Sequence, residues 1–232
     1  MDNLKRSYYS ANYQKFIQDT PEQILGELLV NDPYSTLETQ KNAWRQQVEI
    51  LQKELMNIPI DRILFEYTIP RMGRRVDNVL FYKGVVYVLE FKVGEDTYKS
   101  ADLKQAEGYA LDLKYFQEGS RNCKLVPILI STEAPDSQNR IEIVDEICKP
   151  LHANATNLHD VILRAAKEFT EPDIDGKSWE SSAYHPTPTI IEAGQVLYAE
   201  HSVEEITRHD SVGNSFIQTS HAIGKIITES KK

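Results

Sequence analysis

The pattern of hydrophobic and polar positions changes period several times along the chain, and each change marks a predicted element. Helices are predicted where apolar residues recur at helical spacing behind a capping residue. Strands are predicted where apolar, β-branched and aromatic residues run between turn signals. The predicted helices span residues 20–31, 35–56, 100–116 and 158–169, and the predicted strands span residues 60–69, 74–82, 85–93, 125–131 and 141–144. This order predicts an α/β fold in which helices flank a sheet.

Local composition divides the chain further. Residues 1–170 hold all of these elements and form the predicted main domain. Residues 171–186 are polar and contain Pro, Gly and Ser, which predicts a linker or loop. Residues 187–232 include a capping box that begins at Ser202 and an apolar stretch at residues 217–227, so we expect a helical C-terminal extension there.

The strands joined at Lys83-Gly84 predict a β-hairpin with a two-residue turn. In that register Asp77 lies directly opposite Glu90, and Arg75 lies opposite Lys92. Side chains alternate along a strand, so these four share one face at the end of the hairpin away from the turn. Both faces are otherwise largely apolar, and we therefore expect the hairpin to lie inside the fold.

Two carboxylates opposed on a sheet repel each other and demand a counter-charge. Arg75 and Lys92 could supply it in a purely structural ion network. A divalent cation is the second explanation, because oxygen ligands favour Mg²⁺ or Mn²⁺. Lys92 would then face the same site from two residues beyond Glu90, where it could orient or deprotonate an attacking water. The residues alone leave both explanations open.

The helix that follows the hairpin adds candidates for substrate contact. Gln105 and Tyr109 are four residues apart and share a helical face, with Asp102 nearby. Together with Lys92 and Lys99 they could touch a phosphate backbone or a terminal nucleotide. The alternative is a surface pair without a role.

Charge and composition narrow the class of protein. The formal net charge is −9, which argues against a broad nucleic-acid-coating surface but not against a local groove. No apolar run approaches the ~18 residues that span a bilayer, and no signal peptide begins the sequence, so we expect a cytoplasmic protein without a membrane partner. Cys123 and Cys148 lack metal-ligand spacing and are interpreted as small buried apolar residues.

The combination of these motifs resembles a known family. Val76-Asp77, Glu90-Phe91-Lys92 on the next strand, and Gln105 with Tyr109 on the following helix resemble the RecB-like and lambda-exonuclease-like branch of the PD-(D/E)XK nuclease superfamily. The resemblance implies a restriction-endonuclease-like mixed sheet flanked by helices in residues 1–170. It implies that Asp77 and Glu90 hold Mg²⁺ or Mn²⁺, that Lys92 assists the water, and that Gln105 and Tyr109 support the site or substrate.

The same resemblance implies further, less direct roles. An acidic residue on an early core helix often completes such sites, which points to Glu27, with Glu66 on the preceding strand as its rival. A backbone carbonyl near Phe91 could add a metal ligand, and Arg75 and Lys99 could contact the substrate. The sequence departs from the family name in one position, since Val76 replaces the proline.

A wider resemblance concerns the setting of the domain. Residues 69–77, 89–94, 109–114 and 186–193 resemble the N-terminal part of bacterial proteins that continue into a Schlafen-like DNA/RNA helicase domain. The chain has no Gly-rich loop ending in Lys-Ser/Thr and therefore no ATP site of its own. The resemblance implies a helicase domain as a partner, in cis or in trans. The expected activity is metal-dependent cleavage of DNA in preference to RNA. The alternatives are a non-catalytic nucleic-acid- or protein-binding module that retains the nuclease fold, and a structural regulatory domain for a helicase.

Overall fold

The structure is a computed structural model that describes residues 6–33, 37–70, 73–169 and 171–185. Contacts divide the chain into two units, Met1–His185 and Pro186–Lys232, and all described residues belong to the first. The helices predicted for residues 187–232 therefore lie outside the described residues.

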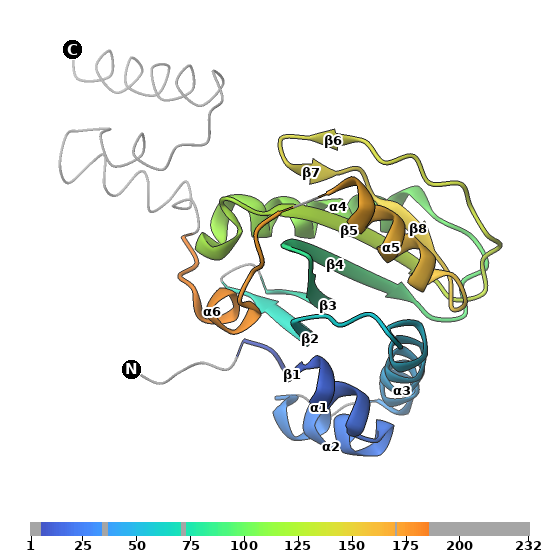
Figure 1. The fold of residues 1–232 in the computed structure, drawn as a ribbon. Helices are drawn as coiled ribbons and strands as arrows, with labels where there is room; N and C mark the ends of the chain where they lie inside the picture. Colours follow the sequence, from blue (N-terminus) through green and yellow to red (C-terminus); the bar gives the residue numbers. More distant parts are fainter. Residues whose placement is uncertain (1–5, 34–36, 71–72, 170, 186–232) are drawn as a thin grey trace, which may run out of the picture. The chain divides into compact units, whose positions relative to one another are not determined.

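A mixed sheet forms the centre of the first unit, with helices packed on both of its faces (Figure 1). Its described strands are β1 (Tyr9–Asn12), β2 (Arg62–Ile69), β3 (Arg74–Tyr82), β4 (Val85–Lys92), β5 (Lys124–Ser131), β6 (Ile143–Val144), β7 (Ile147–Cys148) and β8 (Leu151–Ala153). They are ordered β1-β2-β3-β4-β5-β7-β6, and β8 also pairs with β5. The pairs from β1 to β4 are antiparallel, whereas β5 runs parallel to β4, β7 and β8. The predicted α/β class is thus confirmed.

The described helices are α1 (Tyr13–Gln18), α2 (Pro21–Asn31), α3 (Glu38–Glu54), α4 (Ser100–Phe116), α5 (Leu158–Glu168), α6 (Gly176–Ser181) and the short 3₁₀ turn η1 (Glu118–Ser120). The four helices predicted for residues 1–170 are present as α2, α3, α4 and α5, and the structure adds α1, α6 and η1, which were not predicted. The capping box predicted at the start of α2 is present, because Thr20 accepts from the Gln23 N–H and Gln23 accepts from the Thr20 N–H. In the described residues, no helix is both long and apolar enough to cross a membrane.

Each face of the sheet buries its own hydrophobic core. The first core contains Trp44 from α3 and Ile162 from α5, and the second contains Leu113 from α4 and Trp179 from α6. Residues of β4 alternate between the two, as predicted for a hairpin with apolar faces. Val76 of β3 packs in the second core together with Val79, although strict alternation would place residues three apart on opposite faces. The alternation of β3 thus breaks between these residues, beside Glu66 of β2, where φ is +50°.

The segment predicted as a linker or loop belongs to the first unit instead. Within it, α6 buries Trp179, whose indole N–H donates to Ser120 Oγ at 2.9 Å. Tyr184 forms an isolated bridge with Gln117, and Ala183 accepts the Glu118 N–H at 2.8 Å. The polar composition of this segment gave no sign of a helix that Trp179 anchors and that hydrogen bonds to Gly176 and Glu180 also hold.

Pro127 occupies a position in β5 that explains how a proline fits a central strand. It pairs with Val88 of β4 on one side. On the other side, β7 pairs at Leu125 and β8 pairs from Ile128 onward, so the proline falls between two neighbouring strands. Its missing N–H therefore costs little.

The two cysteines are buried and free, as interpreted from the sequence. Burial raises the pKa of Cys148 to about 11, with the charge of Glu142 acting in the same direction. Burial also raises the pKa of Cys123. Both thiols are therefore protonated and unreactive in the folded state.

Candidate functional site

The hairpin has the predicted register but forks before it reaches the carboxylates. Pairing runs from Tyr82↔Val85 to Asn78↔Leu89 and stops there. Beyond that point β3 continues to pair with β2, and β4 continues to pair with β5. Asp77 and Glu90 are the first residues past the fork, and the Asp77 side chain takes the place of a ladder bond by accepting the Phe91 N–H at 2.7 Å.

A third carboxylate lies at the same level of the sheet. The register of β2 with β3 brings Glu66 opposite Asp77, although this pair is missing from the ladder. Glu66 has φ +50°, a conformation that non-glycine residues rarely adopt. Such strain persists only where the surroundings impose it, and it concentrates at functional sites. Three neighbouring strands thus present Glu66, Asp77 and Glu90 in one row.

Burial and like charge raise the pKa values of this row. For Asp77, burial is the largest cause and the charges of Glu90 and Glu66 follow, so its pKa lies well above the ordinary value. For Glu90, burial also raises the pKa, although Lys92 offsets part of the effect. The pKa of Glu66 is raised by burial, against the hydrogen bond from Trp44 and the charge of Arg75. These carboxyl groups therefore hold protons that a bound metal cation could replace.

Lys92 connects the carboxylates to α4. Its Nζ lies 2.8 Å from Glu90 Oε1, 3.2 Å from Gln105 Oε1 and 3.6 Å from Asp102 Oδ1. Gln105 in turn donates to the Tyr109 hydroxyl at 2.9 Å. Burial alone would lower the pKa of Lys92, but the hydrogen bond and charge of Glu90 outweigh it and raise the pKa. The structure thus brings together four of the residues predicted from the sequence: Glu90, Lys92, Gln105 and Tyr109.

The donor set fits a hard divalent cation held by few protein ligands. Glu90 is 3% exposed, and its Oε2 atom is buried without a hydrogen-bond partner. Asp77 keeps some solvent contact, so an ion can reach it. Within the described ranges, no group of three or more His, Cys, Asp or Glu side chains is arranged to hold a metal ion. Two carboxylates suffice for Mg²⁺, which usually keeps several waters and takes further oxygens from phosphate.

The prediction that Arg75 lies opposite Lys92 was wrong, because β3 and β4 stop pairing at Asn78↔Leu89 and Arg75 pairs with Thr68 of β2 instead. The Nε atom of Arg75 lies 3.2 Å from Glu66 Oε2, its guanidinium donates to the Tyr8 hydroxyl, and Asp32 Oδ1 lies 3.9 Å away. Arg75 therefore neutralises Glu66, and the Asp77–Glu90 pair takes its nearest cation from Lys92.

The other candidate residues named from the sequence differ in whether they act on Asp77 and Glu90. Glu66 is the acid whose charge raises the pKa values of Asp77 and Glu90, whereas the charge of Glu27 acts on Tyr9 of β1. The Phe91 side chain is buried, and its N–H is bound to Asp77. Lys99 precedes α4 and pairs with Glu95 at 2.5 Å.

Trp44 has a role that sequence reasoning missed. It was predicted only as part of the apolar stripe of α3, yet its indole N–H donates to Glu66 Oε1 at 2.7 Å inside the protein. A buried tryptophan normally finds an acceptor, so the sequence held a signal that a polar partner was needed. Helical periodicity could not identify that partner on a strand 22 residues away.

Comparison with known proteins adds no family to this description. No family model matches the sequence, and no curated protein matches it. The chemistry of the fork therefore carries the functional assignment.

Proposed function

We propose that this chain is a Mg²⁺- or Mn²⁺-dependent nuclease domain of the PD-(D/E)XK type, built on a restriction-endonuclease-like core. One observation carries the proposal: Lys92 lies 2.8 Å from Glu90 Oε1 at a fork between strands, while the second Glu90 oxygen is buried without a hydrogen-bond partner and the charge of Glu90 raises the pKa of Asp77. A bound cation would satisfy this buried oxygen and would also offset the repulsion between the two acids.

Asp77 and Glu90 would hold the cation, with the Phe91 carbonyl as a further oxygen. A divalent cation at such a site supplies Lewis-acid chemistry, which neutralises phosphoryl charge and lowers the pKa of water. The Asp77 carboxylate is oriented by the Phe91 N–H, and Glu90 is oriented by Lys92. Both carboxylates are thus already oriented, so that they would bind the cation without rearranging.

Lys92 would act on the water and the phosphate. Its ammonium group has three donors, and Glu90 and Gln105 accept at 2.8 and 3.2 Å. The remaining donor can orient the attacking water or stabilise charge on the scissile phosphate. Gln105 and Tyr109 act as positioning residues, because their hydrogen bond fixes the amide that holds Lys92.

The substrate class is nucleic acid, with DNA preferred to RNA in our proposal. The net charge of −9 disfavours unassisted binding of a polyanion, so the cation and a few local basic residues must provide the attraction. A helicase in cis or in trans would deliver the strand. We propose that the strand is cleaved at the fork.

The test is cleavage of labelled single- and double-stranded DNA and RNA with Mg²⁺ or Mn²⁺. Asp77→Asn, Glu90→Gln and Lys92→Ala are each expected to reduce the rate at least ~100-fold while the fold is retained. Asp112→Asn is the matched control, since Asp112 is a partly buried acid of α4 that pairs with Arg74 at 3.5 Å. A folded Asp77→Asn protein with wild-type activity would refute the assignment. Binding without any cleavage would support the non-catalytic module instead.

A further inference from the structure

Two aromatic rings are stacked near the carboxylates. The ring centroids of Tyr98 and His152 are 4.5 Å apart, and the ring planes differ by only 12°. Tyr98 belongs to the loop between β4 and α4, and His152 belongs to β8. Both residues are partly exposed. Neither belongs to the hydrophobic cores on the two faces of the sheet.

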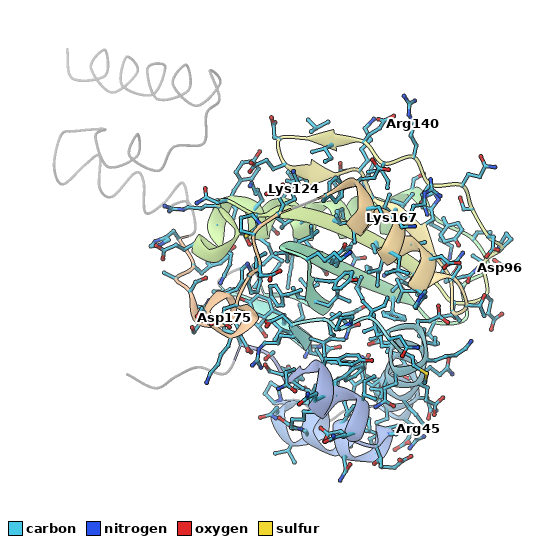
Figure 2. The ribbon with its side chains drawn as sticks, viewed as in Figure 1. Arg45, Asp96, Lys124, Arg140, Lys167 and Asp175 are labelled. Carbon is cyan, nitrogen blue, oxygen red and sulfur yellow. The ribbon has the colours of Figure 1, made fainter. Side chains whose placement is uncertain are left out.

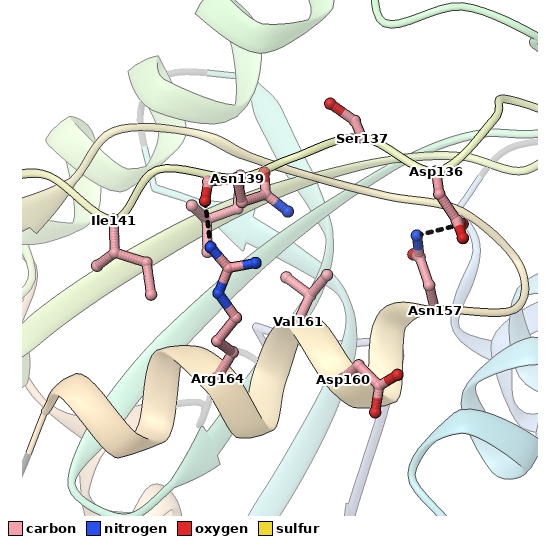
Figure 3. A pocket seen from close by; sticks show the side chains of 9 residues that line it. Asp136, Ser137, Asn139, Ile141, Asn157, Asp160, Val161 and Arg164 are labelled. Atoms are coloured by element: carbon pink, nitrogen blue, oxygen red, sulfur yellow. Dashed lines mark hydrogen bonds between the residues drawn. The ribbon is translucent and has the colours of Figure 1, made fainter.

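The stacked pair is held rigidly by hydrogen bonds at its edges. The Tyr98 hydroxyl donates to the Pro135 carbonyl at 3.0 Å, and Ser137 Oγ lies 3.0 Å from His152 Nδ1. The Asn139 side chain bonds both the N–H and the carbonyl of His152, at 2.7 and 2.8 Å. Arg164 of α5 donates to the Asn139 carbonyl, as Figure 3 shows, so α5 fastens the loop that supports the histidine.

The pair lies on the same face and at the same level of the sheet as Glu90. Glu90 is in register with Leu129 of β5, and Leu129 is in register with His152. Parallel partners in register point to the same face, and two strand spacings amount to about 10 Å. The rings therefore lie within reach of a nucleotide that neighbours a phosphate bound at the fork.

The loop that carries Tyr98 is tied to the carboxyl ends of β4 and β5. The Gly94 N–H donates to Thr132 Oγ1 at 2.8 Å, and the Glu133 N–H donates to the Glu95 carbonyl at 3.0 Å. Asp96, labelled in Figure 2, marks the exposed part of this loop. Ligands of α/β sheets commonly bind outside the carboxyl ends of parallel strands, which is where the stacked rings lie.

We propose that Tyr98 and His152 form a stacking platform for an unpaired nucleobase next to the scissile phosphate, so that the substrate is single-stranded at this point. The inference rests on the proposed nuclease function and adds the strandedness of its substrate. Bases of any identity stack on aromatic faces, so the platform selects unpaired bases without reading sequence. Burial lowers the pKa of His152 and thereby keeps the imidazole neutral near pH 7.

Direct binding to a short single-stranded DNA or RNA oligonucleotide tests the platform. Fluorescence anisotropy would be measured with the whole chain and with Ca²⁺ in place of Mg²⁺ or Mn²⁺, and a gel would confirm that the oligonucleotide stays intact, so that binding is separated from cleavage. Tyr98→Leu keeps much of the volume but removes the π face, and we expect about tenfold weaker binding. Tyr98→Phe should bind nearly as the wild type does. Tyr115→Leu is the matched control, because Tyr115 is an exposed tyrosine in the last turn of α4, away from the loop that carries Tyr98.

A second measurement follows the stacking itself. The fluorescence of 2-aminopurine in a single-stranded oligonucleotide should be quenched on binding to the wild type, and this quenching should disappear in Tyr98→Leu. Unchanged affinity in folded Tyr98→Leu, or quenching that persists in that variant, would overturn the platform. So would tighter binding of blunt duplex than of single strands.

The two proposals fail separately. A protein that cleaves duplex DNA through Asp77 but ignores Tyr98 keeps the nuclease assignment and loses the platform. A protein that stacks bases on Tyr98 but never cleaves keeps the platform and loses the nuclease assignment.

Discussion

At the scale of single residues, the carboxylates at the fork are the costly feature of the molecule. Asp77, Glu90 and Glu66 are charged groups among protein atoms, and Lys92 and Arg75 offset only part of their mutual repulsion. The sequence predicted the opposition of Asp77 and Glu90 because hairpin register follows from the turn. The sequence did not predict the ion pair between Arg75 and Glu66, because that contact depends on a break in strand alternation.

The raised pKa of Asp77 predicts how stability depends on pH in metal-free protein. The folded state holds the Asp77 proton to higher pH than the unfolded state, so stability is lost as pH rises from about 4 through the folded pKa. Asp77→Asn removes this loss, and at pH 8 in EDTA we expect a gain of roughly 1 kcal/mol or more in the free energy of unfolding. Urea unfolding at pH 5 and pH 8 measures it.

Asp19 provides the opposite control for that experiment. Burial raises its pKa, but hydrogen bonds from Lys15 and Tyr9 outweigh burial and lower it. Its contribution is present above the unfolded pKa and is lost as pH falls, so Asp19→Asn should destabilise the protein at pH 8. If the free energy of unfolding of Asp77→Asn depended on pH as that of the wild type does, Asp77 would not be the group with the raised pKa.

At the scale of elements, the β3–β4 turn determines where the site forms. Lys83 and Gly84 both have positive φ, at 48° and 72°, as a two-residue hairpin turn of type I′ requires. A Cβ at Gly84 would lie 2.3 Å from the Pro172 carbonyl oxygen. The turn is thus constrained both by its own backbone and by the segment that leads into α6.

Gly84→Ala is therefore expected to lower the free energy of unfolding by roughly 2 kcal/mol or more. Gly26→Ala is the matched control, because Gly26 lies inside α2 with nothing within 4 Å of its added Cβ. That substitution should raise stability by about 0.5–1 kcal/mol. Chemical denaturation of both variants checks the pair, and a neutral Gly84→Ala would contradict the described packing.

Long periodic elements were predictable, whereas most short ones were not; the exception is β6 (Ile143–Val144), which lies within the strand predicted at residues 141–144. The helices α2, α3, α4 and α5 and the strands β2 to β5 have enough residues for period and capping to be recognised. By contrast, β7 and β8 are two and three residues long, and they exist because β5 offers them a partner. The same holds for the candidate site: hairpin register and helix spacing could be predicted from the sequence, whereas the contact between Trp44 and Glu66 could not.

At the scale of the whole first unit, α6 completes the second core. The Trp179 ring lies 5.3 Å from the ring of Tyr67 on β2 and 5.0 Å from that of Phe81 on β3. These strands also carry Glu66 and Asp77. A segment that composition predicts as a linker thus supports the strands that form the fork.

Trp179→Ala is expected to lower the free energy of unfolding by about 3–5 kcal/mol, because a fully buried indole leaves a cavity. Trp179→Phe should cost less, since it retains an aromatic ring and loses mainly the hydrogen bond to Ser120. Urea unfolding followed by circular dichroism compares them. A loss below ~1 kcal/mol for Trp179→Ala would mean that α6 is a dispensable appendage.

Calorimetric titration of the whole chain with Mn²⁺ is the decisive measurement for the fork. We predict that the wild type binds Mn²⁺ with an affinity that rises with pH, since bound protons compete for Asp77 and Glu90. Asp77→Asn and Glu90→Gln should each weaken binding at least about tenfold, the low end for loss of a metal-site group. Asp112→Asn should bind as the wild type does. A wild-type protein that binds no Mn²⁺ even with nucleic acid present, or variants that bind it as tightly, would contradict a metal-dependent site at Asp77 and Glu90.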